Sequence, residues 1–301
     1  MRNTAKFDEK YQRDCRNDEE LVALCRQEWI EDREREPDFS GLPSPLASLH
    51  WRGGLPQLRL AQKLAGSDDL VDRQLAADIA GQLGWDQRFA DERRALLGSL
   101  LEDAEEAVIR AACFALGHGM SQPSMLARLS ELRHHPDVRM RRACVSALGG
   151  LQSLVAATDL SCLMTDVDAD IRNWATFYMS NCTSDERQAN WVLPLFVERI
   201  EKDTDQVVRG ESLRGIWERK NRALARAMCR QMLADEEADL LVFETAGDLA
   251  DPSLLPLLMS WQERGDQGYL EEAIAACRAS LKKELRMRIS ALKQGASKCR
   301  K

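Results

Sequence analysis

One amphipathic helix pattern recurs six times along the chain, at intervals of 30 to 37 residues. The copies align on the reference positions Gly84, Gly117, Gly149, Ser180, Trp217 and Gly247. In most copies, apolar or small residues stand one, five and nine places before the reference. Residues spaced by four lie on one face of a helix, and a small side chain in the middle favours close packing against a neighbouring helix.

An acidic residue stands twelve places before each reference position, where each helix is expected to begin. At that position it can accept hydrogen bonds from free backbone N–H groups and complement the helix dipole. The six acids are Asp72, Glu105, Asp137, Asp168, Asp205 and Asp235.

A second apolar stretch follows each of these helices. The stretches span residues 88–101, 122–133, 153–164, 185–200, 222–233 and 252–264, and most carry Leu, Met or Ile at a spacing of three and four. A single helix pair cannot bury its apolar face alone, but a stack of pairs can. The pattern therefore predicts an all-α fold, an α-α superhelix of about six stacked helix pairs with helical caps.

The clearest copies read EEAVIRAACFALG at residues 105–117 and DVRMRRACVSALG at residues 137–149. This motif resembles the short bacterial HEAT-like repeat, the type also found in phycobilisome lyases, over about residues 55–265. The resemblance implies that each acid and the Arg four residues later form a ladder joining adjacent repeats. The first, second and last copies lack this Arg, so the implied ladder consists of Asp137, Arg141, Asp168, Arg172, Asp205 and Arg209.

The two ends of the chain depart from the repeat. Residues 8–35 predict an amphipathic helix, a break with three prolines follows at residues 36–45, and residues 269–292 predict a long closing helix. We expect residues 1–45 to be a helical cap with a Pro-rich connection, residues 46–268 the repeat array, and residues 269–301 a C-terminal helix with a basic tail. The alternative for the N-terminal segment is a mobile arm that docks on a partner.

The charge is unevenly distributed along the chain. The whole chain carries a net charge of −7, and residues 278–301 carry +8, which leaves −15 on residues 1–277. Such an acidic body favours a basic partner protein and disfavours a nucleic-acid-coating protein, because phosphate binding needs dense positive charge. Nucleic acid is expected only through the basic tail at residues 278–301.

Nine scattered cysteines without a Cys-x-x-Cys motif indicate reduced, mostly buried thiols. The polar N-terminus and the absence of a long apolar stretch predict a cytoplasmic protein without a membrane span. Neither a nucleophile motif, a phosphate-binding loop nor a zinc-binding motif is found. His134 and His135 lie in an expected turn between repeats, and Asp166, Asp168 and Asp170 lack the Gly and distal Glu of a calcium loop. We therefore expect no catalytic residue, metal or cofactor.

The expected contact surface lies on the second helices, which generally line the concave side of HEAT-like arrays. An exposed aromatic or charged residue on that side can anchor a partner protein. The residues predicted to form this patch are Arg128, Asp159, Arg187, Trp191 and Glu198. The competing interpretation is that Trp191 belongs to the core.

Three functions follow from these features. The leading hypothesis is a non-catalytic protein-binding scaffold or adaptor, including an inhibitor or immunity-type role, whose concave surface holds a basic protein. The second is an enzyme on a HEAT-like scaffold, resembling a bilin lyase or a DNA glycosylase. The third is nucleic-acid binding through the basic tail.

Overall fold

The computed structural model describes residues 11, 14–31, 44–85, 87–151, 154–181, 191–235, 238–262 and 268–298. The regular elements among these residues are all helices, and no strand occurs there, as the predicted all-α fold requires. The Pro-rich break at residues 36–43, the candidate Arg187 and the cysteines Cys182 and Cys299 lie outside the described residues.

The chain divides into two compact units, Met1–Asp159 and Leu160–Lys301. The helices of the first unit are α2 (Asp18–Glu31), α3 (Pro45–Arg52), α4 (Leu55–Ala65), α5 (Leu70–Gly81), α6 (Ala90–Leu100), α7 (Glu106–Gly117), α8 (Leu126–Leu132) and α9 (Val138–Leu151). Helix α10 (Leu154–Leu163) runs across the division between the units. Those of the second unit are α11 (Ala169–Ser180), α13 (Val192–Lys202), α14 (Gln206–Glu218), α15 (Arg222–Ala234), α16 (Leu240–Leu249), α17 (Leu255–Gln262) and α18 (Leu270–Lys298).

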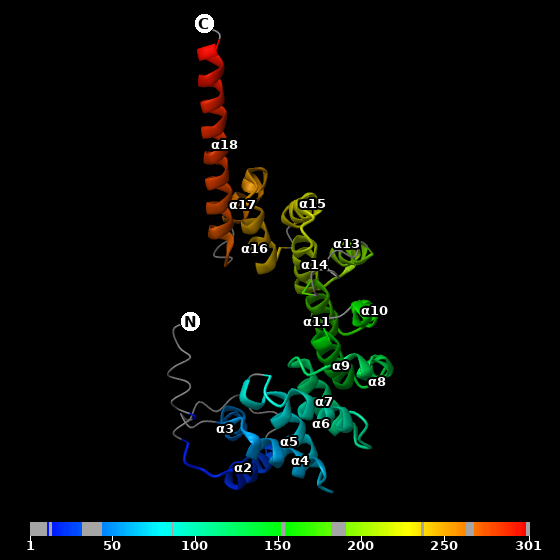
Figure 1. Ribbon diagram of the computed structural model, residues 1–301. Helices are drawn as coiled ribbons and strands as arrows, with labels where there is room; N and C mark the ends of the chain where they lie inside the picture. The colour runs from blue at the N-terminus through cyan, green and yellow to red at the C-terminus, as the bar shows by residue number, and fades with distance from the viewer. Residues whose placement is uncertain are drawn as a thin grey trace. The chain divides into compact units, whose positions relative to one another are not determined.

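Helix pairs repeat within each unit. In the first, α7 packs between α5 and α9, and α6 and α8 lie against this row as second helices. In the second, α14 packs between α11 and α16, while α13 and α15 form the accompanying row (Figure 1). Within each unit, neighbouring first helices thus contact one another, which is the arrangement of a stacked helical repeat.

The first copy of the repeat begins three residues earlier than the sequence pattern predicts. Asp69, and not Asp72, caps α5, because its side chain accepts a hydrogen bond from the Val71 N–H at 2.8 Å. The prediction was wrong because it aligned this copy on Gly84. Gly84 lies beyond the end of α5 with φ 67°, in the left-handed region that glycine enters at low cost.

The last copy is displaced in the opposite direction. Asp235 follows the end of α15, whereas Asp239 caps α16 and accepts hydrogen bonds from the Leu241 and Val242 N–H groups. With both ends corrected, all six copies carry a small, fully buried residue seven places after the acid at the helix start. These residues are Ala76, Ala112, Cys144, Ala175, Ser212 and Ala246.

The N-terminal helix α2 packs on α3 and α5 and buries Leu21, Val22 and Cys25. Its Arg26 forms an ion pair with Asp72, with 2.6 Å between Nε and Oδ1. In the corrected register, Asp72 stands where the other copies bury an apolar residue. Helix α2 therefore supplies the countercharge for an acid that lies almost fully buried in α5.

Helix α18 closes the second unit against α16 and α17, and it extends six residues beyond the predicted end at Leu292. Within the described residues, no helix combines the length and the apolar character that crossing a bilayer requires. Cys25, Cys113, Cys144, Cys229 and Cys277 are free and buried, while Cys15 and Cys162 are exposed.

Candidate functional site

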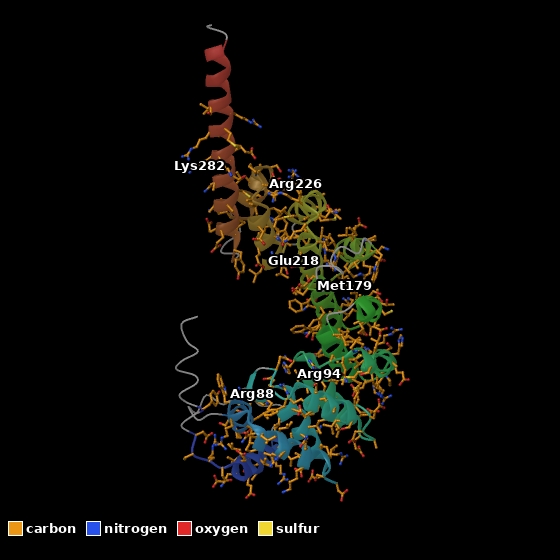
Figure 2. The ribbon with its side chains drawn as sticks, viewed as in Figure 1. Arg88, Arg94, Met179, Glu218, Arg226 and Lys282 are labelled. Carbon is orange, nitrogen blue, oxygen red and sulfur yellow. The ribbon has the colours of Figure 1, made fainter. Side chains whose placement is uncertain are left out.

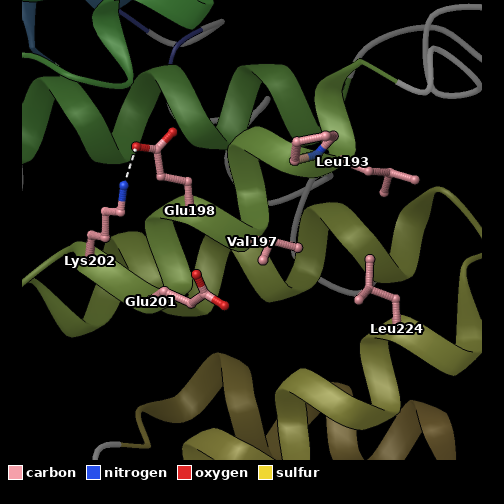
Figure 3. Close-up of a pocket in the computed structure, with 7 residues that line it drawn as sticks. Leu193, Val197, Glu198, Glu201, Lys202 and Leu224 are labelled. Carbon is pink, nitrogen blue, oxygen red and sulfur yellow. Dashed lines mark hydrogen bonds and ion pairs between the residues drawn. The ribbon is translucent and has the colours of Figure 1, made fainter.

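An open groove of about 660 Å³ runs between α13 and α15 in the second unit (Figure 3). It is lined by Leu193, Pro194, Val197, Glu198, Glu201, Lys202 and Leu224. All of these belong to second helices of the repeats. The groove therefore lies on the row of helices on which a contact surface was expected.

The groove exists because α13 is apolar on two faces. Its inner face buries Val192, Phe196 and Ile200. Leu193 and Val197, one turn apart on the neighbouring face, are only half-buried and face the groove. Leu224 contributes from α15, so the floor is apolar and partly open to solvent.

Charged side chains form one edge of the groove. The Glu198 carboxylate accepts a hydrogen bond from Lys202 Nζ at 3.0 Å (Figure 3). Arg199 lies 3.6 Å from the same carboxylate. The hydrogen bond from Lys202 lowers the pKa of Glu198 below its usual value, so this carboxylate remains charged at neutral pH. Glu201 is exposed beside them.

Trp191 immediately precedes α13 and has 43 % of its surface exposed. It is therefore not a core residue, which settles the competing interpretation. Pro194 and Glu198 follow it by three and seven residues, so the three share one side of the helix. Trp191 thus adds an exposed aromatic ring at the N-terminal end of the groove-lining helix.

The predicted patch also included Arg128 and Asp159, which belong to the first unit. Arg128 lies 3.0 Å from Glu131 and 3.7 Å from Glu102 on that unit's surface. Asp159 is buried, accepts a hydrogen bond from Ser130 and pairs with Arg133. Its carboxylate is consequently engaged inside the unit and does not offer a surface contact.

The predicted ladder residues have several different partners. Asp168 and Asp205 cap their own helices, and Asp137 holds Arg139 at 2.8 Å. Arg141 donates to the His135 and Pro136 carbonyl oxygens, and Arg209 is buried. The ladder across three consecutive units remains a prediction.

Arg172 forms its ion pair with Asp203, which is not one of the predicted ladder residues. Its Nε and Nη2 donate to the two carboxylate oxygens of Asp203, both at 2.8 Å, and Asp203 lies two places before the next helix-capping acid. Arg73 reaches Asp103 in the same way, at 2.8 Å in the first unit. The sequence pattern missed Arg73 because the misplaced first copy put Ala76 at its position.

The carboxyl and thiol groups whose pKa is raised by burial do not line the groove. Burial raises the pKa of Asp78 to about 7 and that of Cys25 to about 12. A thiol with such a pKa is protonated at neutral pH and is a weak nucleophile. Over the described part of the chain, no group of three or more His, Cys, Asp or Glu residues is arranged to hold a metal ion. The chemistry that the groove offers is therefore recognition of an apolar segment with charged neighbours.

Four groove residues were missed at the level of sequence: Leu193, Pro194, Val197 and Leu224. A signal was present, since residues 192–197 are apolar all round, which exceeds what one buried face needs. The pattern alone does not indicate which of these residues stay open to solvent. The contribution of Leu224 depends on how α15 lies against α13, which no local pattern contains.

The stacked first helices, the accompanying second helices and the repeated capping acids define an α solenoid of the HEAT-repeat class. The family model described as HEAT repeats matches residues 94–180. These residues carry HEAT repeats, and the fold around them is a helical-repeat solenoid.

The chain is similar to protein YibA of Escherichia coli K12, with 24 % identity over 216 residues that cover 70 % of this chain and 75 % of YibA. The X-ray structure of YibA superposes with a TM-score of 0.59 at 21 % identity, covering 92 % of this chain and 97 % of YibA. The karyopherin Kap121p, bound to the extreme C-terminus of the protein phosphatase Cdc14p, superposes with a TM-score of 0.59 at 13 % identity. That match covers 84 % of this chain and 32 % of Kap121p, so the chain spans about a third of the karyopherin. At these identities the structural likenesses establish the fold alone.

Proposed function

We propose that this protein is a non-catalytic scaffold that holds a partner protein in the groove between α13 and α15. The observation that carries the proposal is the half-exposed apolar floor made by Leu193, Val197 and Leu224. Apolar side chains that stay open to solvent in a concave groove mark interaction sites, because burying them releases water. Trp191 and Glu198 supply an aromatic anchor and a charged edge.

The charge of the chain favours a basic partner. Residues 1–277 carry a net −15, a field that attracts positively charged proteins and accelerates their encounter. In this proposal, residues 1–45 cap the array, residues 46–268 form it, and residues 269–301 close it. The protein acts in the cytoplasm, and an inhibitor or immunity-type role against a basic protein is one form of this function.

The likeness to Kap121p supports the proposal at the level of fold. Kap121p has been seen bound to the extreme C-terminus of Cdc14p and bound to Pho4p. A helical-repeat surface can therefore hold another protein. The groove between α13 and α15 is the surface that we propose for this chain.

Site-specific photo-crosslinking tests the proposal. p-Benzoylphenylalanine placed at Val197 in the groove should crosslink one partner protein in cells, which mass spectrometry then identifies. The same group at Met259, an exposed apolar position on α17, serves as the matched control. The purified partner should bind the chain with a Val197→Asp substitution at least about tenfold more weakly than the wild type, because a buried charge at the contact is costly.

Met259→Asp should leave that affinity unchanged. Equal crosslinking from both positions, or an unchanged affinity after Val197→Asp, would count against the groove as the binding site.

A further inference from the structure

Helix α18 carries an apolar stripe that is packed in its first half and open in its second. Ala273, Ile274 and Cys277 are buried against α16 and α17. Beyond Cys277 the stripe continues at Leu281 and Leu285, which are 36 % and 48 % exposed. The spacing of three and four residues keeps all of these side chains on one face.

Ile289 extends the open stripe by one further turn and is 51 % exposed. Residues 281–290 therefore present about 15 Å of exposed helix face, at about 1.5 Å per residue. Figure 1 shows this part of α18 continuing beyond α17 within the second unit. The open face is continuous with one that already packs against helices, so its shape suits another helix.

Positive charge flanks the open stripe. Lys282, Lys283, Arg286 and Arg288 are exposed, and Glu284 is the one acidic residue between Arg278 and Ser290. Lys282 is labelled on this part of the helix in Figure 2. A surface that combines an apolar stripe with basic flanks is complementary to a helix with an apolar stripe and acidic flanks.

Three other occupants fit these observations less well. Nucleic acid would use the lysines and arginines but leave the apolar stripe in water. An anionic bilayer can accept a basic amphipathic helix, but the −15 on residues 1–277 would be repelled from its surface. A second copy of α18 would bring basic side chains against basic side chains.

We propose that the open face of α18, formed by Leu281, Leu285 and Ile289, docks an acidic amphipathic helix of a partner protein. The three apolar side chains pack into the partner's apolar stripe. Lys282 and Arg286, one turn apart on one flank of the stripe, pair with carboxylates on the partner helix. This surface is separate from the α13–α15 groove and selects the opposite charge, so the inference does not depend on the proposed function.

Fluorescence anisotropy on the full chain tests this proposal. The probe is a labelled synthetic helix with Leu at a spacing of three and four and Glu on both flanks. We expect the double substitution Leu281→Ser and Leu285→Ser to weaken binding at least about tenfold, and Lys282→Glu with Arg286→Glu to do the same. All of these side chains are exposed, so circular dichroism should show unchanged helix content.

Met287→Ser is the matched control. Met287 is 56 % exposed, more than Leu285, but it points to another side of the helix, so its loss should leave the affinity unchanged. A probe with Lys in place of Glu should not bind.

Several outcomes would overturn the proposal. If the serine variants bind like the wild type while the charge variants do not, the probe is held by non-specific attraction. Phosphatidylglycerol vesicles or a short DNA duplex that binds residues 278–301 more tightly than the probe would identify a different class of partner. Dimerisation that is lost in the serine variants would assign the stripe to a second copy of the chain.

Discussion

At the scale of single residues, Arg172 joins one repeat of the second unit to the next. Its guanidinium forms two parallel hydrogen bonds with Asp203, whose side chain is only 1 % exposed. Burial alone would raise the pKa of Asp203, but the hydrogen bonds from Arg172 and the Asp205 N–H outweigh this and hold it below its usual value. The carboxylate is thus charged, nearly buried and dependent on Arg172.

Removal of the guanidinium should therefore destabilise the protein. We expect Arg172→Ala to lower the free energy of unfolding by about 2–3 kcal/mol, because Asp203 keeps a buried charge without its main partner. Urea denaturation of the full chain measures this. The control is Arg139→Ala, since the Arg139 side chain is 66 % exposed and its pair with Asp137 should contribute little. Equal losses in the two variants would contradict the assigned role of Arg172.

Glu211 on α14 should make stability dependent on pH. Burial, assisted by the nearby Asp239 and Glu244 carboxylates and opposed by Arg214, raises the pKa of Glu211 from 4.5 to about 7. The folded state therefore holds a proton that the unfolded state releases between these values, so the free energy of unfolding falls as the pH rises from 4.5 to 7.

A neutral glutamine at this position should remove that loss. Glu211→Gln should be about 1–2 kcal/mol more stable than the wild type near pH 8 and nearly equal to it near pH 4.5, as chemical denaturation at each pH can show. The exposed Glu201 in the groove provides the control substitution Glu201→Gln. A gain in the free energy of unfolding of Glu211→Gln at acid pH, and not at alkaline pH, would contradict the effect of burial on Glu211.

At the scale of helices, two glycines show how closely the pairs pack. A methyl group added to Gly215 on α14 would stand 2.5 Å from the Phe196 ring on α13. Phe196 is fully buried and has Arg219 4.7 Å above its ring, so it has little freedom to move. A methyl group on Gly98 of α6 would meet only the flexible end of Met125, at 3.3 Å.

The same substitution should therefore have opposite effects at the two positions. Gly215→Ala should lower the melting temperature and cost about 1–3 kcal/mol through overpacking. Gly98→Ala should be neutral or raise stability by about 0.5–1 kcal/mol, because alanine favours the helix. Two destabilised variants of similar size would show that the α13–α14 contact is looser than described.

The helical elements show how far sequence patterns alone can go. The four middle helix starts, at Glu105, Asp137, Asp168 and Asp205, were placed correctly because the acid and the buried positions recur together. The starts of the first and last helices were misplaced by three and four residues, because Gly84 and Asp235 fit the repeat pattern locally. In the structure, Gly84 lies in a turn beyond α5 and Asp235 follows the end of α15. Only packing against neighbours distinguishes the two roles.

The candidate groove was partly accessible from the sequence. Trp191 and Glu198 could be singled out because aromatic and charged residues on second helices are candidate anchors for a partner protein. Leu193, Val197 and Leu224 could not be singled out, because an apolar residue does not reveal which side of its helix lacks a covering neighbour. The buried state of Asp159 was equally hidden, since it depends on Ser130 and Arg133, which lie 29 and 26 residues earlier.

At the scale of the whole molecule, the separation of charge along the chain is the feature most relevant to partners. The −15 on residues 1–277 and the +8 on residues 278–301 should direct different partners to different surfaces. The rate of association with the groove partner should fall as salt rises from about 50 to about 300 mM, because the longer-range attraction is screened. Stopped-flow fluorescence measures this rate, and a salt-independent rate would contradict a basic partner.

The central claim is that a partner protein occupies the groove between α13 and α15. Hydrogen–deuterium exchange of the full chain, with and without the partner identified by crosslinking, tests it most directly. We predict that slowed exchange will be concentrated in Val192–Lys202 and Arg222–Ala234, the two helices that line the groove. Protection confined to other helices, with these two unchanged, would contradict the claim.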